Sequence, residues 1–160
     1  MQSRIRILKF INQLMNTYKQ LYLNFLNNLK EEISLYKNEE DLWKLTGNIS
    51  NTSGNLCLHM CGNLNHFFGA VVGNTGYIRD RDLEFSQKNI GREELIQKIE
   101  ETKTMIENVF DNLSLKNIND IYPLDKFGES ATIGFIMSRL VSHLAYHLGQ
   151  INYHRRILDL

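Results

Sequence analysis

Residues 130–158 have the sequence SATIGFIMSRLVSHLAYHLGQINYHRRIL, and this stretch decides which fold we predict. Its apolar residues and histidines recur every three or four positions, which places them on one face of an α-helix. We expect the helix to start near Ser130 and to end near Leu158. Its predicted interior face consists of Ile133, Ile136, Leu140, His143, His147, Ile151, His154 and Leu158.

Three other segments have the same periodicity and are predicted to be helices, at about Ser3–Tyr36, Thr52–Val72 and Arg92–Leu113. In the first, the predicted buried line is Ile7, Ile11, Leu14, Tyr18, Leu21, Phe25 and Leu29. In the last, it is Leu95, Ile99, Thr102, Ile106, Val109 and Leu113. Because the chain has a single proline, Pro123, we expect an all-α fold. Four helices favour a four-helix bundle that forms one domain, residues 1–160.

Two long connectors separate the last three predicted helices. The second helix is expected to begin at Thr52 or Ser53, because either hydroxyl can accept a hydrogen bond from a free amide of the first helical turn. It is expected to end where residues accept a left-handed backbone, at Gly73, Asn74 and Gly76. A charged connector, residues 77–91, follows, and we expect its part around Arg79 to Glu84 to be a solvated loop with internal ion pairs. The second connector spans residues 114–129, and both are too long for the simplest short-looped bundle.

Composition and charge exclude several classes of function. The chain has 18 Lys and Arg against 18 Asp and Glu, so no overall field attracts phosphate or anionic lipid, and nucleic-acid binding is disfavoured. Its most apolar window, Ile133–Leu148, is too short to span a membrane and is interrupted by Arg139 and two histidines. Cys57 and Cys61 make no disulfide framework. We expect them to pack as small apolar residues in a reduced, cytoplasmic protein with no membrane association.

All five histidines lie on the second and fourth predicted helices. His143 and His147 are four residues apart, so they share one helix face and can both reach one ion. Both continue the apolar line of the fourth helix, where a buried imidazole needs a partner for its ring nitrogens. A transition metal is one such partner. The alternative is two core histidines that are hydrogen-bonded to the backbone or to Tyr and Asn side chains.

Two known kinds of helical metal site do not fit this sequence. Zincin proteases need a glutamate within the histidine pair, and here the intervening residues are Leu144, Ala145 and Tyr146. Ferritin-like di-iron sites need a glutamate three residues before the histidine. The residues at that position are Leu56, Asn63, Leu140, Leu144 and Ile151.

A third ligand has to come from another helix, and His59 and His66 are the candidates. They lie on nearly one face of the second helix, about 10 Å apart along its axis, so one ion cannot easily take both. Periodicity alone does not choose between them. His154 lies about 10 Å beyond His147 by the same rise. It is expected to act as a polar cap near the end of the bundle.

Three runs, LHMCGNLNHF (58–67), GYIRDRD (76–82) and HLAYHLGQI (143–151), together resemble the DinB-like superfamily of candidate metalloenzymes, especially a subgroup described as of unknown function. The resemblance extends from about Tyr22 to Leu158. It implies a four-helix bundle with one metal ligand from the second helix and two from the fourth: His59, His143 and His147. It also implies that His66 is not the expected ligand. Relatives often dimerise, so a homodimer is expected.

The resemblance also implies a chemistry. Three histidines leave one position open on a zinc-like ion, which is the pattern of catalytic sites. By analogy with relatives that use thiols, we expect the metal to activate a low-molecular-weight thiol for transfer to an electrophile. A metal-dependent hydrolase, and a non-catalytic bundle stapled by the metal, are the alternatives. Zinc or nickel is expected first, while iron and manganese also accept imidazole. No general base is identified, and the nearby polar candidates are Asn63, Tyr146 and Gln150.

Overall fold

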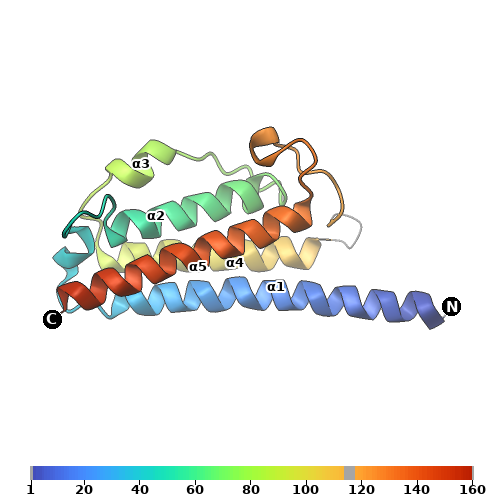
Figure 1. Cartoon of the computed structure of the whole chain (residues 1–160), viewed down its shortest axis with the longest axis horizontal. Coiled ribbons are helices and arrows are strands. Elements are labelled where there is room, and N and C mark those ends of the chain that lie inside the picture. The colour runs from blue at the N-terminus through green and yellow to red at the C-terminus, as the bar shows by residue number, and fades with distance from the viewer. Residues whose placement is uncertain (1, 114–117, 160) are drawn as a thin grey trace.

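The computed structural model describes residues 2–113 and 118–159, and it confirms the all-α prediction. Four long helices lie side by side: α1 (Gln2–Ser34), α2 (Ser53–Leu64), α4 (Arg92–Asn112) and α5 (Ile133–Leu158) (Figure 1). Both α1 and α2 pack against α4 and α5. Shorter helical segments lie in the connectors: η1 (Glu39–Trp43), η2 (Asn65–Ala70), α3 (Arg81–Ser86) and η3 (Asp125–Phe127). No described helix is long and apolar enough to cross a membrane.

The buried line of α1 agrees only in part with the predicted one, because Leu29 is buried and Ile11, Tyr18 and Phe25 are partly buried against the core. Ile7, Leu14 and Leu21 are exposed, whereas the core residues of α1 are Met15, Tyr22, Leu26, Leu29 and Ile33. Two neighbouring lines of this helix are both apolar, so periodicity does not fix its rotation. The hydroxyl of Tyr22 donates to the carbonyl of Met137 on α5 at 2.7 Å. This contact, together with packing on α4 and α5, selects the second line.

Helix α2 is the central element of the bundle, since every one of its residues is buried. Thr52 caps it as predicted, because its hydroxyl accepts from the amide of Asn55 at 3.2 Å. The helix then continues into η2 as a π-helix, which the sequence analysis did not predict. The predicted end is confirmed by positive φ angles at Asn74 (50°) and Gly76 (75°).

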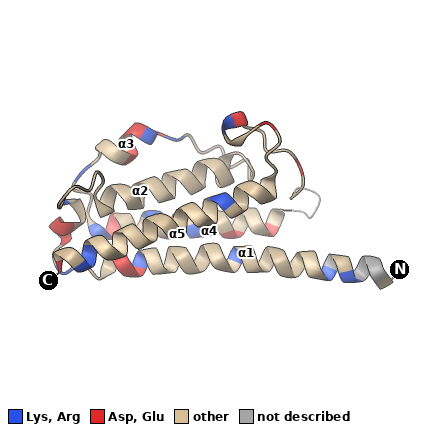
Figure 2. Cartoon of the chain, viewed as in Figure 1, with Lys and Arg blue, Asp and Glu red and all other residues tan. Residues whose placement is uncertain are grey.

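The charged connector after α2 contains the short helix α3. The carboxylate of Asp80 caps α3 by accepting from the amide of Leu83 at 2.9 Å. Six residues are too few for apolar periodicity to show in a sequence, so a loop was predicted. The side-chain amide of Asn55 donates to the carbonyls of Glu84 (3.0 Å) and Gln87 (2.8 Å), which ties α3 to α2. Figure 2 shows charged residues at the start of α3, whereas α2 has none.

The second connector leads into α5 later than predicted. Part of it, residues 114–117, lies outside the described residues. Helix α5 begins at Ile133 rather than near Ser130, because the hydroxyl of Thr132 caps it by accepting from the amide of Phe135 at 3.2 Å. On α5, Ile133, Ile136, Leu140, Ile151 and His154 are buried as predicted, while His143, His147 and Leu158 are half-buried.

Candidate metal centre

The structure brings together His59 on α2 with His143 and His147 on α5. Ligand nitrogens of the three rings all lie within 4.8 Å of one another. The Nε2 atoms of His59 and His143 are 3.1 Å apart. The ring centroids of His143 and His147 are 4.4 Å apart, and those of His59 and His147 are 5.2 Å apart. The three rings therefore converge on one small volume between the two helices.

Glu84 on α3 fixes the orientation of His59. Its Oε2 atom lies 2.9 Å from Nδ1 of His59. The guanidinium of Arg79 donates to both oxygens of the same carboxylate, at 2.6 Å to Oε1 and 2.7 Å to Oε2. Because Nδ1 of His59 donates its proton to Glu84, the lone pair of this imidazole lies on Nε2, which faces the other histidines.

Hydrogen bonds and the charge of Arg79 keep Glu84 ionised despite its burial. Burial by itself would raise the pKa of this carboxyl, but hydrogen bonds from Arg79 and His59 outweigh it and hold the pKa below its ordinary value. The side chains of Arg79 and Glu84 are only 7% and 6% exposed. The predicted ion pair within this segment is present, and the charged residues between Arg79 and Glu84 are exposed as predicted. The side chains of Arg79 and Glu84 themselves are buried, and part of the segment is the helix α3 rather than a loop. The capped helix α3 turns both residues inward, a placement that no periodicity in the sequence could reveal.

His147 has a hydrogen-bond partner of its own on α5. Its Nδ1 atom is 2.7 Å from Oε1 of Gln150, and Nε2 of Gln150 donates to the hydroxyl of Tyr146 at 3.1 Å. This contact again leaves Nε2 of the imidazole free to face the cluster. Gln150 and Tyr146, two of the three polar candidates, therefore lie at the site. The third candidate, Asn63, is buried beside it, and its Oδ1 atom has no hydrogen-bond partner.

The two histidines that α5 contributes to the cluster, His143 and His147, are neutral at physiological pH. Burial, together with the nearby His147 and His59, lowers the pKa of His143 to about 4. Burial also lowers the pKa of His147. Neutral imidazole is the form that binds transition metals, so the environment favours the ligating state.

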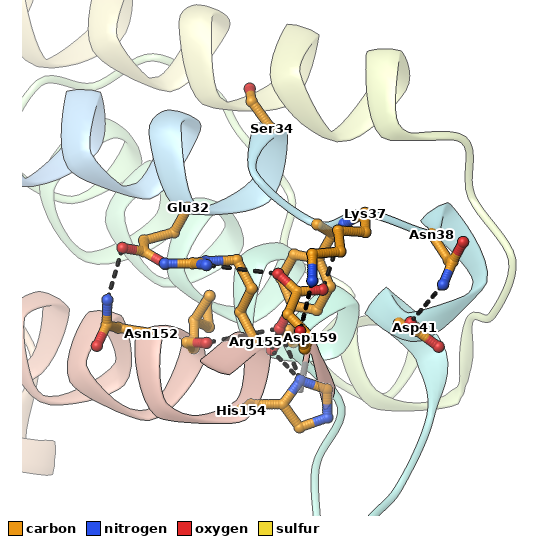
Figure 3. Close-up of polar contacts among 12 residues, drawn as sticks. Glu32, Ser34, Lys37, Asn38, Asp41, Asn152, His154, Arg155 and Asp159 are labelled. Carbon is orange, nitrogen blue, oxygen red and sulfur yellow. Dashed lines mark hydrogen bonds and ion pairs between the residues drawn. The ribbon is translucent and has the colours of Figure 1, made fainter. Parts of the chain in front are cut away.

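The remaining histidines lie elsewhere. His154 is buried at the C-terminal end of α5, where its Nδ1 atom is 2.6 Å from the hydroxyl of Tyr36 and 2.9 Å from that of Ser53 (Figure 3). Its Nε2 atom donates to the carbonyl of Lys44 at 2.9 Å. His154 therefore lies near the bundle end as predicted, but in the interior. His66 packs on the ring of Phe67, with centroids 4.7 Å apart, and stays outside the cluster.

Cys57 and Cys61 are buried, and their thiols are free. Neither belongs to the group of side chains that could hold a metal. Their positions agree with the predicted packing role. A cavity of about 450 Å³ opens beside the cluster and is lined by His59, His143 and Asn63 among others. Two of the three histidines, His59 and His143, are thus accessible from this cavity.

Comparison with known proteins identifies a family without an assigned activity. The model of the family described as "Protein of unknown function (DUF1572)" matches residues 6–159. No curated protein and no solved structure gives a significant match. The function is therefore inferred from the geometry of the site.

Proposed function

The chain belongs to the DUF1572 family, and on this basis we propose that His59, His143 and His147 bind one divalent transition metal ion at a catalytic centre. The observation that supports the proposal is the convergence of three imidazoles with two of their Nδ1 atoms already engaged by Glu84 and Gln150. Metal-binding histidines characteristically have such partners on their second nitrogen.

The spacing of the donor atoms fits a metal. A Zn–N bond of about 2.0–2.1 Å in a tetrahedral arrangement places two nitrogens about 3.3 Å apart. The Nε2 atoms of His59 and His143 are 3.1 Å apart, and the other separations, at most 4.8 Å, need only small ring movements. We propose zinc or nickel as the first choices, with iron or manganese as further possibilities, since all accept imidazole.

The site has the composition of a catalytic centre rather than a structural one. Structural zinc sites are closed by four protein ligands, whereas catalytic sites use three and keep one position for water or substrate. No fourth His, Cys, Asp or Glu of the described residues joins the cluster. The 450 Å³ cavity lies beside His59 and His143 and can accept a small molecule.

For the reaction, we propose activation of a low-molecular-weight thiol, in keeping with the resemblance to the DinB-like superfamily. A bound ion would supply Lewis acidity that lowers the pKa of the thiol. The thiolate would then form a bond to an electrophilic carbon, whose leaving group departs with its electron pair, while the thiol proton passes to solvent. Glu84 and Gln150 would hold His59 and His147 in place.

The test is a thiol panel with one electrophile. Zinc-loaded protein is incubated with cysteine, glutathione or 2-mercaptoethanol and 1-chloro-2,4-dinitrobenzene, and conjugates are quantified by mass spectrometry. We expect a conjugate above the background of His59→Ala. If no thiol gives one, thiol transfer is contradicted. Turnover of p-nitrophenyl esters without added thiol would support the hydrolase alternative instead.

A non-catalytic role has support in one observation: the ligands come from two different helices. An ion would therefore cross-link α2 and α5. A structural staple predicts a large fall in thermal stability on metal removal, whereas an open catalytic site predicts a smaller one. Melting of zinc-loaded and EDTA-treated protein, compared with His59→Ala, separates the two roles.

We also propose that the chain forms a homodimer through the N-terminal part of α1. Its exposed apolar residues include Ile7 (59% exposed) and Phe10 (67%), and this end of α1 extends beyond the other helices (Figure 1). Light scattering should give twice the 18.7 kDa of the chain, and Phe10→Lys should reduce it to the monomer mass. Phe135→Lys, at another exposed phenylalanine, is the matched control. A monomeric wild type contradicts the dimer.

A further inference from the structure

Among the residues that the structure describes, four cationic side chains and no acidic one line the cavity beside His59 and His143. We call it the cationic cavity; its cations are Arg79, Arg81, Lys126 and Arg139. They come from four places in the chain: the segment before α3, the first residue of α3, η3 and the N-terminal part of α5. Folding thus gathers positive charge at one point of a protein whose formal net charge is zero.

Most of this charge has no anionic partner in the protein. Arg79 is neutralised by Glu84. Within the described part of the chain, the other three cations have no carboxylate oxygen within 4.0 Å. The pKa of Lys126 is lowered by partial burial and by its neighbours Arg79, Arg81 and Arg139. The cations therefore repel one another, and an incoming anion would relieve that repulsion.

Aromatic rings hold these cations in place without neutralising them. The Nζ atom of Lys126 lies 4.7 Å from the ring centroid of Phe67, and the guanidinium of Arg139 lies 5.3 Å from that of Phe127. Phe67 and Phe127 themselves line the cavity. A cation over a ring keeps its charge and its free N–H donors, so the ammonium of Lys126 and the guanidinium of Arg139 stay available to a ligand.

A buried polar group in the cavity wall also lacks a partner. Asn63 is 8% exposed, and its Oδ1 atom is buried with no hydrogen bond. Burying an amide without a partner is unfavourable, and such groups in native proteins commonly serve a ligand. Since Asn63 lines the same cavity as His59 and the cations, its side chain is in a position to contact a ligand there.

We infer that the cationic cavity binds the anionic group, a carboxylate or a phosphate, of a small substrate whose reactive part lies at the three histidines. The volume of about 450 Å³ fits one small molecule. Arg81, Lys126 and Arg139 would bind the anion by charge-assisted hydrogen bonds, and Asn63 would contact the adjoining part of the molecule. The position of the reactive part rests on the proposed metal function, whereas binding of the anion does not.

The test measures anion binding and metal binding separately. Calorimetric titrations use inorganic phosphate and succinate, with neutral succinamide as the uncharged comparison, on EDTA-treated and zinc-loaded protein at constant ionic strength. We expect both anions, but not succinamide, to bind to both forms of the protein. Arg139→Gln and Lys126→Gln should each weaken anion binding roughly tenfold, the effect of removing one charge-assisted hydrogen bond. Their zinc content should equal that of the wild type.

The matched control is Arg156→Gln. Arg156 is on α5, as Arg139 is, and its guanidinium lies 5.9 Å from the ring centroid of Tyr153. It does not line the cavity. The inference would be overturned if Arg139→Gln and Lys126→Gln bound the anions as tightly as Arg156→Gln does. It would also be overturned if the wild type bound succinamide as tightly as succinate. Anion binding by a protein that takes up no metal would support the inference while contradicting the metal proposal. Zinc binding without anion binding would overturn this inference and would leave the metal proposal intact.

Discussion

Glu84 lies against the backbone of Gly62 on one side and 2.9 Å from Nδ1 of His59 on the other. A Cβ atom at Gly62 would be only 2.0 Å from Oε1 of Glu84. The carboxylate therefore reaches His59 only because α2 has no side chain at residue 62. The orientation of His59, a candidate ligand, therefore depends both on the short helix α3 and on Gly62 of α2.

Replacing Glu84 with glutamine should weaken metal binding. The amide lacks the negative charge that favours proton donation by Nδ1 of His59, and partners of this kind typically contribute a factor of about 10–100 in metal affinity. Competition titration with a chromophoric zinc chelator measures the effect. Glu107→Gln, at an exposed position of α4, is the control and should bind zinc like the wild type. Equal affinities in the two variants would contradict the role of Glu84.

Gly62→Ala should displace Glu84 and thereby reduce both stability and metal affinity. We expect a loss of about 1–3 kcal/mol in the free energy of unfolding, the range for inserting a methyl group into a packed site. The control is Gly149→Ala, because a Cβ at this helical glycine would meet nothing within 4 Å. That variant should gain about 0.5–1 kcal/mol. Urea denaturation and zinc titration measure the two effects, and unchanged metal affinity in Gly62→Ala would be the contrary result.

The sequence predicted the architecture and two of the clustered histidines for a clear physical reason. Periodicity reports which face of a helix is buried, and it placed His143 and His147 on the interior side of α5. It could not choose between His59 and His66, because both lie on nearly one face of the predicted second helix. That choice came from the resemblance to a family; in the structure His59 joins the cluster and His66 does not.

The parts that the sequence did not predict depend on contacts between distant segments. The rotation of α1 is set by its neighbours, so an adjoining apolar line was predicted as the buried one. Glu84 and Arg79 looked like solvent-exposed charges because nothing local shows that α3 folds back on α2. The cationic cavity likewise combines residues from four segments, each unremarkable in its own sequence context.

Tyr36→Phe should destabilise the chain without affecting the metal centre. The Tyr36 hydroxyl bonds to Ser53 and lies 2.6 Å from Nδ1 of His154. His154 is near the C-terminal end of α5 (Figure 3), about 16 Å along the helix axis from His143. Its loss leaves Ser53 and His154 bonded to each other at 2.9 Å, so we expect a cost of about 1 kcal/mol, at the low end for a buried polar group. Tyr153→Phe, at an exposed tyrosine, should change stability little. A fall in zinc content in Tyr36→Phe would show that the two sites are coupled.

Acid should destabilise the metal-free protein through His143. The pKa of this imidazole is about 4 in the folded chain, against about 6.5 in an unfolded chain. Between these two values the unfolded state binds more protons than the folded state, so stability falls as pH decreases from about 6.5 to about 4 and levels off below. His143→Gln removes this contribution, and its stability should therefore depend less steeply on pH across that window. Urea denaturation of EDTA-treated proteins at half-unit pH intervals measures both slopes. Equal slopes in the wild type and in His143→Gln would mean that His143 titrates normally in the fold, and the buried, neutral state that favours metal binding would then be wrong.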